Sequence, residues 1–138
     1  MKQTAMLTTA SLLNILLVTF HLADDILFGM ASPRFANLFA VLVFVIWLYG
    51  TLVLAERRAG YIIILVGSLL GLLVPVIHMK GARGVLGGEI GNSTQAFFFV
   101  WTLLALGVTS MFAALLSAHA LWRLPWRRHA SAADNARC

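Results

Sequence analysis

The chain has 138 residues, of which 61% are hydrophobic and only 11% are charged. A soluble globular domain is nearer to half apolar and a quarter charged, so this composition excludes an ordinary soluble enzyme and favours a protein of the lipid bilayer. The formal net charge is +5, but the basic residues gather at the ends of apolar segments and in the tail. That distribution is typical of membrane orientation signals and not of a nucleic-acid-binding surface.

The first long apolar segment covers about residues 5–30. It continues as "ILFGM" after two aspartates, so we interpret it as a retained helix and not as a cleaved signal peptide. Three further apolar runs follow at 35–55, 61–79 and 96–122. Each is close to or above the ~20 residues that a helix needs to cross about 30 Å of hydrocarbon. The sequence therefore predicts an all-α integral membrane protein, with residues 1–122 folded as a four-helix transmembrane bundle.

The distribution of lysine and arginine predicts how this bundle is oriented. Short links join the first three segments, so neighbouring helices should run antiparallel, in an up-down-up-down order. One side of the membrane would carry Lys2, Arg57, Arg58, Arg123, Arg127, Arg128 and Arg137, and the other Arg34, Lys80 and Arg83. Basic residues favour the cytoplasmic side, so both termini should be cytoplasmic. Together with the small size, this predicts a multi-pass protein of a bacterial cytoplasmic membrane.

Residues 123–138 follow the last apolar segment and have a different composition. They begin with a basic strip in which Arg123, Trp126, Arg127 and Arg128 are suited to contact lipid headgroups. The remainder, "SAADNARC", has the composition of a disordered tail. The only cysteine is the last residue, so an intrachain disulfide is excluded.

The most informative motif lies near the end of the first segment, in "TFHLADDILFG". On a helix, positions i, i+3 and i+4 share one face, so His21, Asp24 and Asp25 should project together. The same face carries Asn14 and Ser11 further back, interrupted by an apolar turn. Because lipid cannot satisfy polar groups, this face should point into the bundle.

Two more ionisable residues are expected on the same, outer side of the membrane. His78 lies at the end of the third segment, and Glu89 lies in the glycine-rich connection that follows it. Pro75 should kink the third helix just before His78, because proline lacks the backbone N–H that the helix needs. His21 and His78 are thus predicted to meet in space on the basis of shared sidedness.

Two histidines and three carboxylates are suited to a mixed nitrogen and oxygen site for zinc, iron, copper or manganese. Two histidines on different helices could also hold a b-type haem. That option ranks lower, since the positions of His21 and His78 in their helices suggest a depth mismatch of roughly 10 Å at 1.5 Å per residue. The same groups also fit a proton path, and they fit interfacial ion pairs that bind no ligand at least as well as a metal site.

The remaining signals concern packing. "GSLLG" places Gly67 and Gly71 at a small-xxx-small spacing that lets two helices approach closely, either inside the bundle or in a homodimer. The first, third and fourth helices are expected to supply the polar interior. The second, which has few polar residues, should be the most exposed to lipid.

No catalytic, nucleotide-binding or nucleic-acid-binding motif is present, so an enzyme is not favoured. The leading hypothesis is a small membrane subunit that binds a metal or cofactor for a larger redox or transport assembly. One alternative is a small proton- or ion-coupled transporter or channel that uses Ser11, Asn14, His21 and Asp25 as a path. Another is an accessory structural protein without any ligand.

Overall fold

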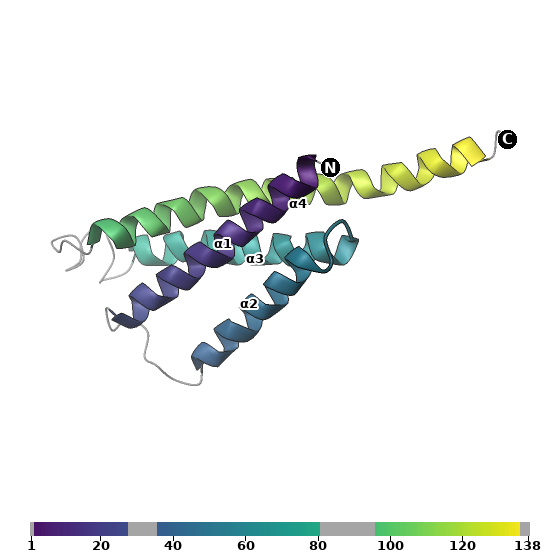
Figure 1. The fold of residues 1–138 in the computed structure, drawn as a ribbon. Coiled ribbons are helices and arrows are strands. Elements are labelled where there is room, and N and C mark those ends of the chain that lie inside the picture. The colour runs from purple at the N-terminus through teal and green to yellow at the C-terminus, as the bar shows by residue number, and fades with distance from the viewer. Residues whose placement is uncertain (1, 28–35, 81–95, 136–138) are drawn as a thin grey trace.

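The computed structural model describes residues 2–27, 36–80 and 96–135. These residues form four helices: α1 (Lys2–Leu27), α2 (Ala36–Leu52), α3 (Arg58–Lys80) and α4 (Ala96–Asn135). Consecutive helices run in opposite directions, and α1 crosses α3 and α4 obliquely (Figure 1). α4 packs against both α3 and α1, while α2 covers the side formed by α1 and α3. The described part of the chain is therefore an all-helical bundle.

Three of these helices are long and apolar enough to cross a membrane: Gln3–Leu27, Arg58–Met79 and Phe97–Leu124. The apolar part of α2, Phe39–Leu52, is shorter. The 17 residues of α2 rise only about 26 Å at 1.5 Å per residue, slightly less than the ~30 Å hydrocarbon layer. The second helix was predicted over residues 35–55, and in the structure it ends earlier, at Leu52.

α2 ends in a tight turn that leads directly into α3. The amide of Val53 donates to the carbonyl of Tyr49 at 2.9 Å, and the amide of Arg57 donates to the carbonyl of Leu54 at 3.0 Å. Glu56 has a φ of 68°, in the left-handed region. Gly60 lies directly against the Leu54 carbonyl, where a Cβ would collide with the backbone. These contacts reverse the chain within a few residues and hold α2 beside α3.

α4 continues to Asn135, through residues that the sequence predicted to be a basic strip and a disordered tail. Three arginines and three alanines are among the residues of this stretch, and both types have high helix propensity. The helix therefore extends beyond the apolar segment that starts it. Arg123 is exposed, whereas the predicted headgroup contacts of Trp126, Arg127 and Arg128 fall on side chains outside the described part of the chain.

The bundle is apolar outside and partly polar inside. Large apolar side chains are exposed on all four helices, including Leu16, Val45, Leu73 and Leu115. The polar and ionisable side chains that are buried come from all four helices: Ser11, Asn14, His21, Thr51, Ser68, Thr102, Ser110 and Ser117. This inverted pattern suits a protein surrounded by lipid, because lipid does not compete for the polar groups. The predicted contribution of the first, third and fourth helices is present, and Thr51 of α2 adds to it.

Close approach of the helices depends on two glycines of α3. Gly67 lies against the indole ring of Trp47 in α2, and Gly71 lies against the hydroxyl of Ser110 in α4. A methyl group at either position would collide with the neighbouring side chain. The small-xxx-small motif therefore serves two contacts inside the bundle, one on each side of α3. Pro75 lies within α3, and its ring faces Gly107 of α4.

Candidate metal centre

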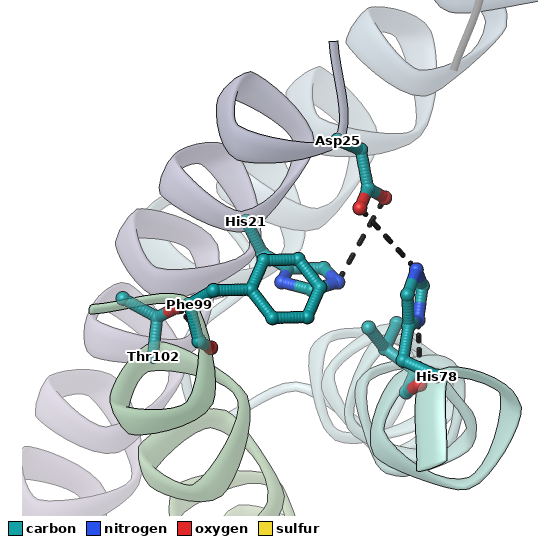
Figure 2. A network of polar contacts seen from close by, with 6 residues as sticks. His21, Asp25, His78, Phe99 and Thr102 are labelled. Atoms are coloured by element: carbon teal, nitrogen blue, oxygen red, sulfur yellow. Dashed lines mark hydrogen bonds and ion pairs between the residues drawn. The ribbon is translucent and has the colours of Figure 1, made fainter. Parts of the chain in front are cut away.

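The site begins with α1, which presents His21 and Asp25 one turn apart on the same face. His21 Nε2 lies 3.8 Å from Asp25 Oδ2. His21 is 2% exposed, while the Asp25 side chain retains 14% exposure. Figure 2 shows both side chains directed toward α3. A helical i, i+4 spacing is sufficient to bring these two groups together.

α3 supplies the third member, His78. Its Nε2 lies 3.3 Å from Asp25 Oδ1, and its ring centroid lies 4.6 Å from that of His21 with the two planes at 86°. The prediction that the two histidines meet is therefore confirmed. The depth mismatch of roughly 10 Å expected between them is wrong, because the two ring centroids are only 4.6 Å apart; α1 crosses the bundle obliquely (Figure 1).

Phe99 of α4 closes the site from the third side. This ring is 1% exposed and lies 4.9 Å from the ring of His21 and 5.8 Å from that of His78, centroid to centroid. Figure 2 shows the Phe99 ring beside that of His21. The Phe99 ring limits the movement of both imidazole rings and covers the side of the site that faces α4.

A backbone contact determines which nitrogen of His78 faces the site. His78 Nδ1 lies 2.9 Å from the carbonyl oxygen of Val74. A carbonyl only accepts, so Nδ1 carries the hydrogen and donates it. In the neutral ring, Nε2 then has its lone pair directed toward Asp25. Metal-bound histidines are typically fixed in this way, with the other ring nitrogen donating to a carbonyl or carboxylate.

The arrangement leaves acceptors facing one another. Asp25 Oδ1, although 3.3 Å from His78 Nε2, has no hydrogen-bond partner among the described residues, and neither does either ring nitrogen of His21. Unpartnered buried polar groups cost on the order of 1–3 kcal/mol each. Two acceptor atoms at such a distance are stabilised by a cation between them, either a proton or a metal ion.

The three side chains can also converge on one ion. One ligand atom from each of His21, Asp25 and His78 lies within 4.8 Å of the other two. Tetrahedral ligands at 2.0–2.1 Å from zinc are separated by about 3.3 Å. The contact between His78 Nε2 and Asp25 Oδ1 has that length at 3.3 Å, whereas His21 Nε2 lies 3.8 Å from the other oxygen, Oδ2. The three side chains would have to draw closer together to complete a three-ligand set.

The other predicted ligands differ in their placement. Asp24 is partly buried on α1 and is not a member of the three-residue group, since the next position on a helix points about 100° away. Glu89 lies outside the described residues. Ser11 and Asn14, predicted as a polar path, are both fully buried further along α1.

Two functional contributions were not predicted from sequence. Phe99 is the third residue of an FFFV run whose members look alike in sequence, and only packing distinguishes it. Trp47 was not among the predicted site residues; it is 3% exposed and donates from Nε1 to Ser11 Oγ at 2.9 Å. Thr51 follows Trp47 by four residues, and this spacing could have indicated that the two residues share a polar face of α2.

The arrangement of the two histidine rings disfavours haem, for a reason other than the depth mismatch. Two axial histidines bind a haem iron from opposite faces of the macrocycle, so the porphyrin plane separates their rings. Here the rings of His21 and His78 are in edge-to-face contact, with Phe99 against both. A macrocycle between the two rings would require the helices to separate.

No family model, curated protein or solved structure matches this chain.

Proposed function

We propose that this chain is a small multi-pass membrane protein that binds one transition metal ion between His21, Asp25 and His78. The observation that carries the proposal is the convergence of three donor atoms from two helices within 4.8 Å. The nitrogens of the buried His21 are without a hydrogen-bond partner in the described structure. Zinc and non-haem iron(II) are favoured, since two histidines with one carboxylate form a donor set that both ions use. Copper and manganese are the other candidates.

The small size of the bundle supports a role within a larger complex. A bundle of this size is suited to serve as a metal-binding subunit of a larger redox or transport assembly. Asp24 and Glu89 stay predicted as additional ligands. The large exposed apolar surface of α2, which includes Phe39, Val41 and Leu42, is available for lipid or for a partner helix.

The proposed location is a bacterial cytoplasmic membrane, with all four helices crossing it and both termini in the cytoplasm. The seven-to-three distribution of basic residues supports this orientation. Cys138 is the only thiol in the sequence and reports the position of the C-terminus. A membrane-impermeant maleimide should label it only after the cells are permeabilised. Labelling in intact cells would place the C-terminus outside.

The decisive experiment is elemental analysis of the protein purified in mild detergent without chelator. Wild type is compared with His21→Ala and His78→Ala. His119→Ala is the matched control, because His119 contacts Gln3 at 3.2 Å and lies about 30 Å along α4 from Phe99, at 1.5 Å per residue. We expect near-stoichiometric metal in wild type and in the control, and loss of metal in both site variants.

The proposal fails if gently purified wild type takes up no zinc, iron, copper or manganese even when each ion is added. Equal metal content in wild type and in folded His21→Ala would also contradict it. In either case a proton shared between His78 and Asp25 would be the cation that holds the acceptors together, and the cluster would be an ion pair.

A proton or ion path is the second candidate, and one observation favours it. Asn14 is fully buried, and both its amide nitrogen and its oxygen are without a hydrogen-bond partner in the described structure. Such a group would be satisfied by water in a path that leads from Asp25 along α1. Liposomes with wild-type protein should then show pH-dependent ion flux that is lost in Asp25→Asn. Flux that survives this substitution would exclude the path.

A further inference from the structure

A cleft of about 260 Å³ opens beside the metal centre, between α1, α2 and α3. Its walls are apolar and are formed mainly by Val18, Ala40, Phe44, Trp47, Leu70 and Val74. The polar groups of His21, Asp25 and His78 lie together along it. From Leu70 to His78 the cleft extends about 12 Å along α3, at 1.5 Å per residue. It is therefore an apolar slot with a polar end.

The mouth of the cleft faces the side of the bundle that lipid would cover. Val43 and Leu70, which line it, are exposed large apolar residues of α2 and α3. Their neighbours on the same helices, Ile46 and Leu73, are also exposed. A molecule that enters here would come from the hydrocarbon layer and would have to be lipid-soluble.

The polar end is rich in acceptors. The Asp25 carboxylate accepts through both oxygens when ionised, and His78 Nε2 is an acceptor because Nδ1 donates to Val74. His21 is 2% exposed, and its two ring nitrogens have no hydrogen-bond partner within the described ranges. A guest that donates hydrogen bonds would satisfy this end, whereas a guest that only accepts would not.

We propose that the cleft binds a lipid-soluble hydroquinone, with one ring hydroxyl at the His21–Asp25–His78 end and the apolar tail leaving between α2 and α3. A single aromatic ring suits the volume, which lies just below the usual range of about 300–1,000 Å³ for whole drug-sized ligands. Phe44 and Trp47 supply aromatic surface for the ring. The hydroxyl donates to the Asp25 carboxylate, whose side chain retains 14% exposure.

Other membrane molecules match the cleft less well. A phospholipid headgroup would place its phosphate beside the Asp25 carboxylate, and no lysine or arginine of the described residues lines this cleft. A hydrocarbon chain alone would leave the acceptors unpartnered. The inference goes beyond the metal site, because it needs the acceptor groups and the slot but not a bound ion.

The test measures binding of decyl hydroquinone by calorimetry, with protein in lipid nanodiscs, without oxygen and with excess chelator. Under these conditions the result does not depend on whether the metal proposal is correct. We expect saturable binding at one molecule per chain. The dimethyl ether of the same compound, which has no hydroxyl to donate, should bind at least about ten-fold more weakly. Equal affinity for the two compounds, or no saturable binding, would overturn the proposal.

A matched pair of variants on α2 tests the location. Ala40 lines the cleft, and the neighbouring Val41 is 53% exposed on the outer surface. Ala40→Phe should fill the cleft and weaken hydroquinone binding at least about ten-fold, while leaving metal content unchanged. Val41→Phe should bind as wild type does. Unchanged binding in folded Ala40→Phe would overturn the location.

Photo-crosslinking of the unmodified chain avoids any folding defect. A hydroquinone with a diazirine in its tail should label peptides of α2 and α3 near the mouth, around Val43 and Leu70, and excess decyl hydroquinone should suppress the labelling. Labelling that is spread over all lipid-facing surfaces and is not suppressed would contradict a specific cleft.

Discussion

Two buried polar clusters of this bundle behave in opposite ways. In the first, Trp47 Nε1 donates to Ser11 Oγ at 2.9 Å, and the hydroxyls of Ser11 and Thr51 are 2.7 Å apart. Thr51 also donates to the carbonyl of Trp47 at 2.8 Å. We call these three residues the closed cluster. Every hydroxyl and the indole N–H has a partner within it.

The second cluster, His21 with Asp25 and His78, is open by comparison. Its contacts are longer, 3.3 and 3.8 Å, and His21 has two nitrogens without a hydrogen-bond partner in the described chain. Both clusters join α1 to a neighbouring helix. The closed cluster is thus complete within itself, whereas the open one leaves polar atoms that a ligand or a proton could complete.

The largest expected effect is on the closed cluster. Trp47→Ala removes a buried ring that packs on Gly67 and leaves Ser11 without its donor. We expect a loss of about 3–5 kcal/mol in the free energy of unfolding, measured by denaturant unfolding in detergent. Trp101, 61% exposed, is the control, and Trp101→Ala should change little. A large loss of metal in folded Trp47→Ala would show that the two clusters are not independent.

The next effect concerns the open cluster. Asp25→Ala removes the carboxylate that lies between the two histidines. We expect zinc affinity to fall more than about 100-fold, which exceeds the loss typical of a residue that only hydrogen-bonds to a metal ligand. Competition with a chromophoric chelator measures it. Asp24→Ala, the adjacent substitution, should cost much less if the three-residue group is the complete set. Equal losses would make Asp24 a ligand as well.

Phe99→Leu is expected to have a smaller effect on the same cluster. Leucine retains an apolar side chain but removes the ring that holds both imidazoles. Zinc affinity should fall about ten-fold, because the histidines lose their fixed orientation. The neighbouring Phe98 is 51% exposed, so Phe98→Leu should leave affinity unchanged. If the two variants bind zinc with the same affinity, Phe99 contributes only to packing and does not orient the histidines.

The smallest effect is expected for single hydroxyls of the closed cluster. Ser11→Ala and Thr51→Val should each cost about 0.6–1.7 kcal/mol, the range of hydrogen bonds between membrane helices. Because the two hydroxyls bond one another, the double variant should cost less than the sum. Unfolding of the four proteins in detergent gives this coupling. Strict additivity would show that the cluster does not act as a unit.

Sequence predicted most of the architecture through composition and length. Four apolar runs predicted four helices, and the i, i+4 spacing placed His21 and Asp25 together. The predicted end of the last helix differs from Asn135, because hydropathy marks where a helix meets the membrane surface and not where it stops. The buried position of Trp47 was not predictable, since an aromatic residue in an apolar run is equally suited to lipid and to a bundle interior.

What the sequence alone determined is local: an all-helical chain, apolar segments of membrane length, and a histidine and an aspartate on one face of one helix. These follow from residue composition and from the fixed rise and rotation of the α-helix. The tertiary structure decided which distant residues meet. The oblique crossing of α1 brought His21 to His78, and Gly67 and Gly71 allowed α3 to approach its neighbours. Helix crossing depends on side-chain packing between segments, which no local pattern in the chain encodes.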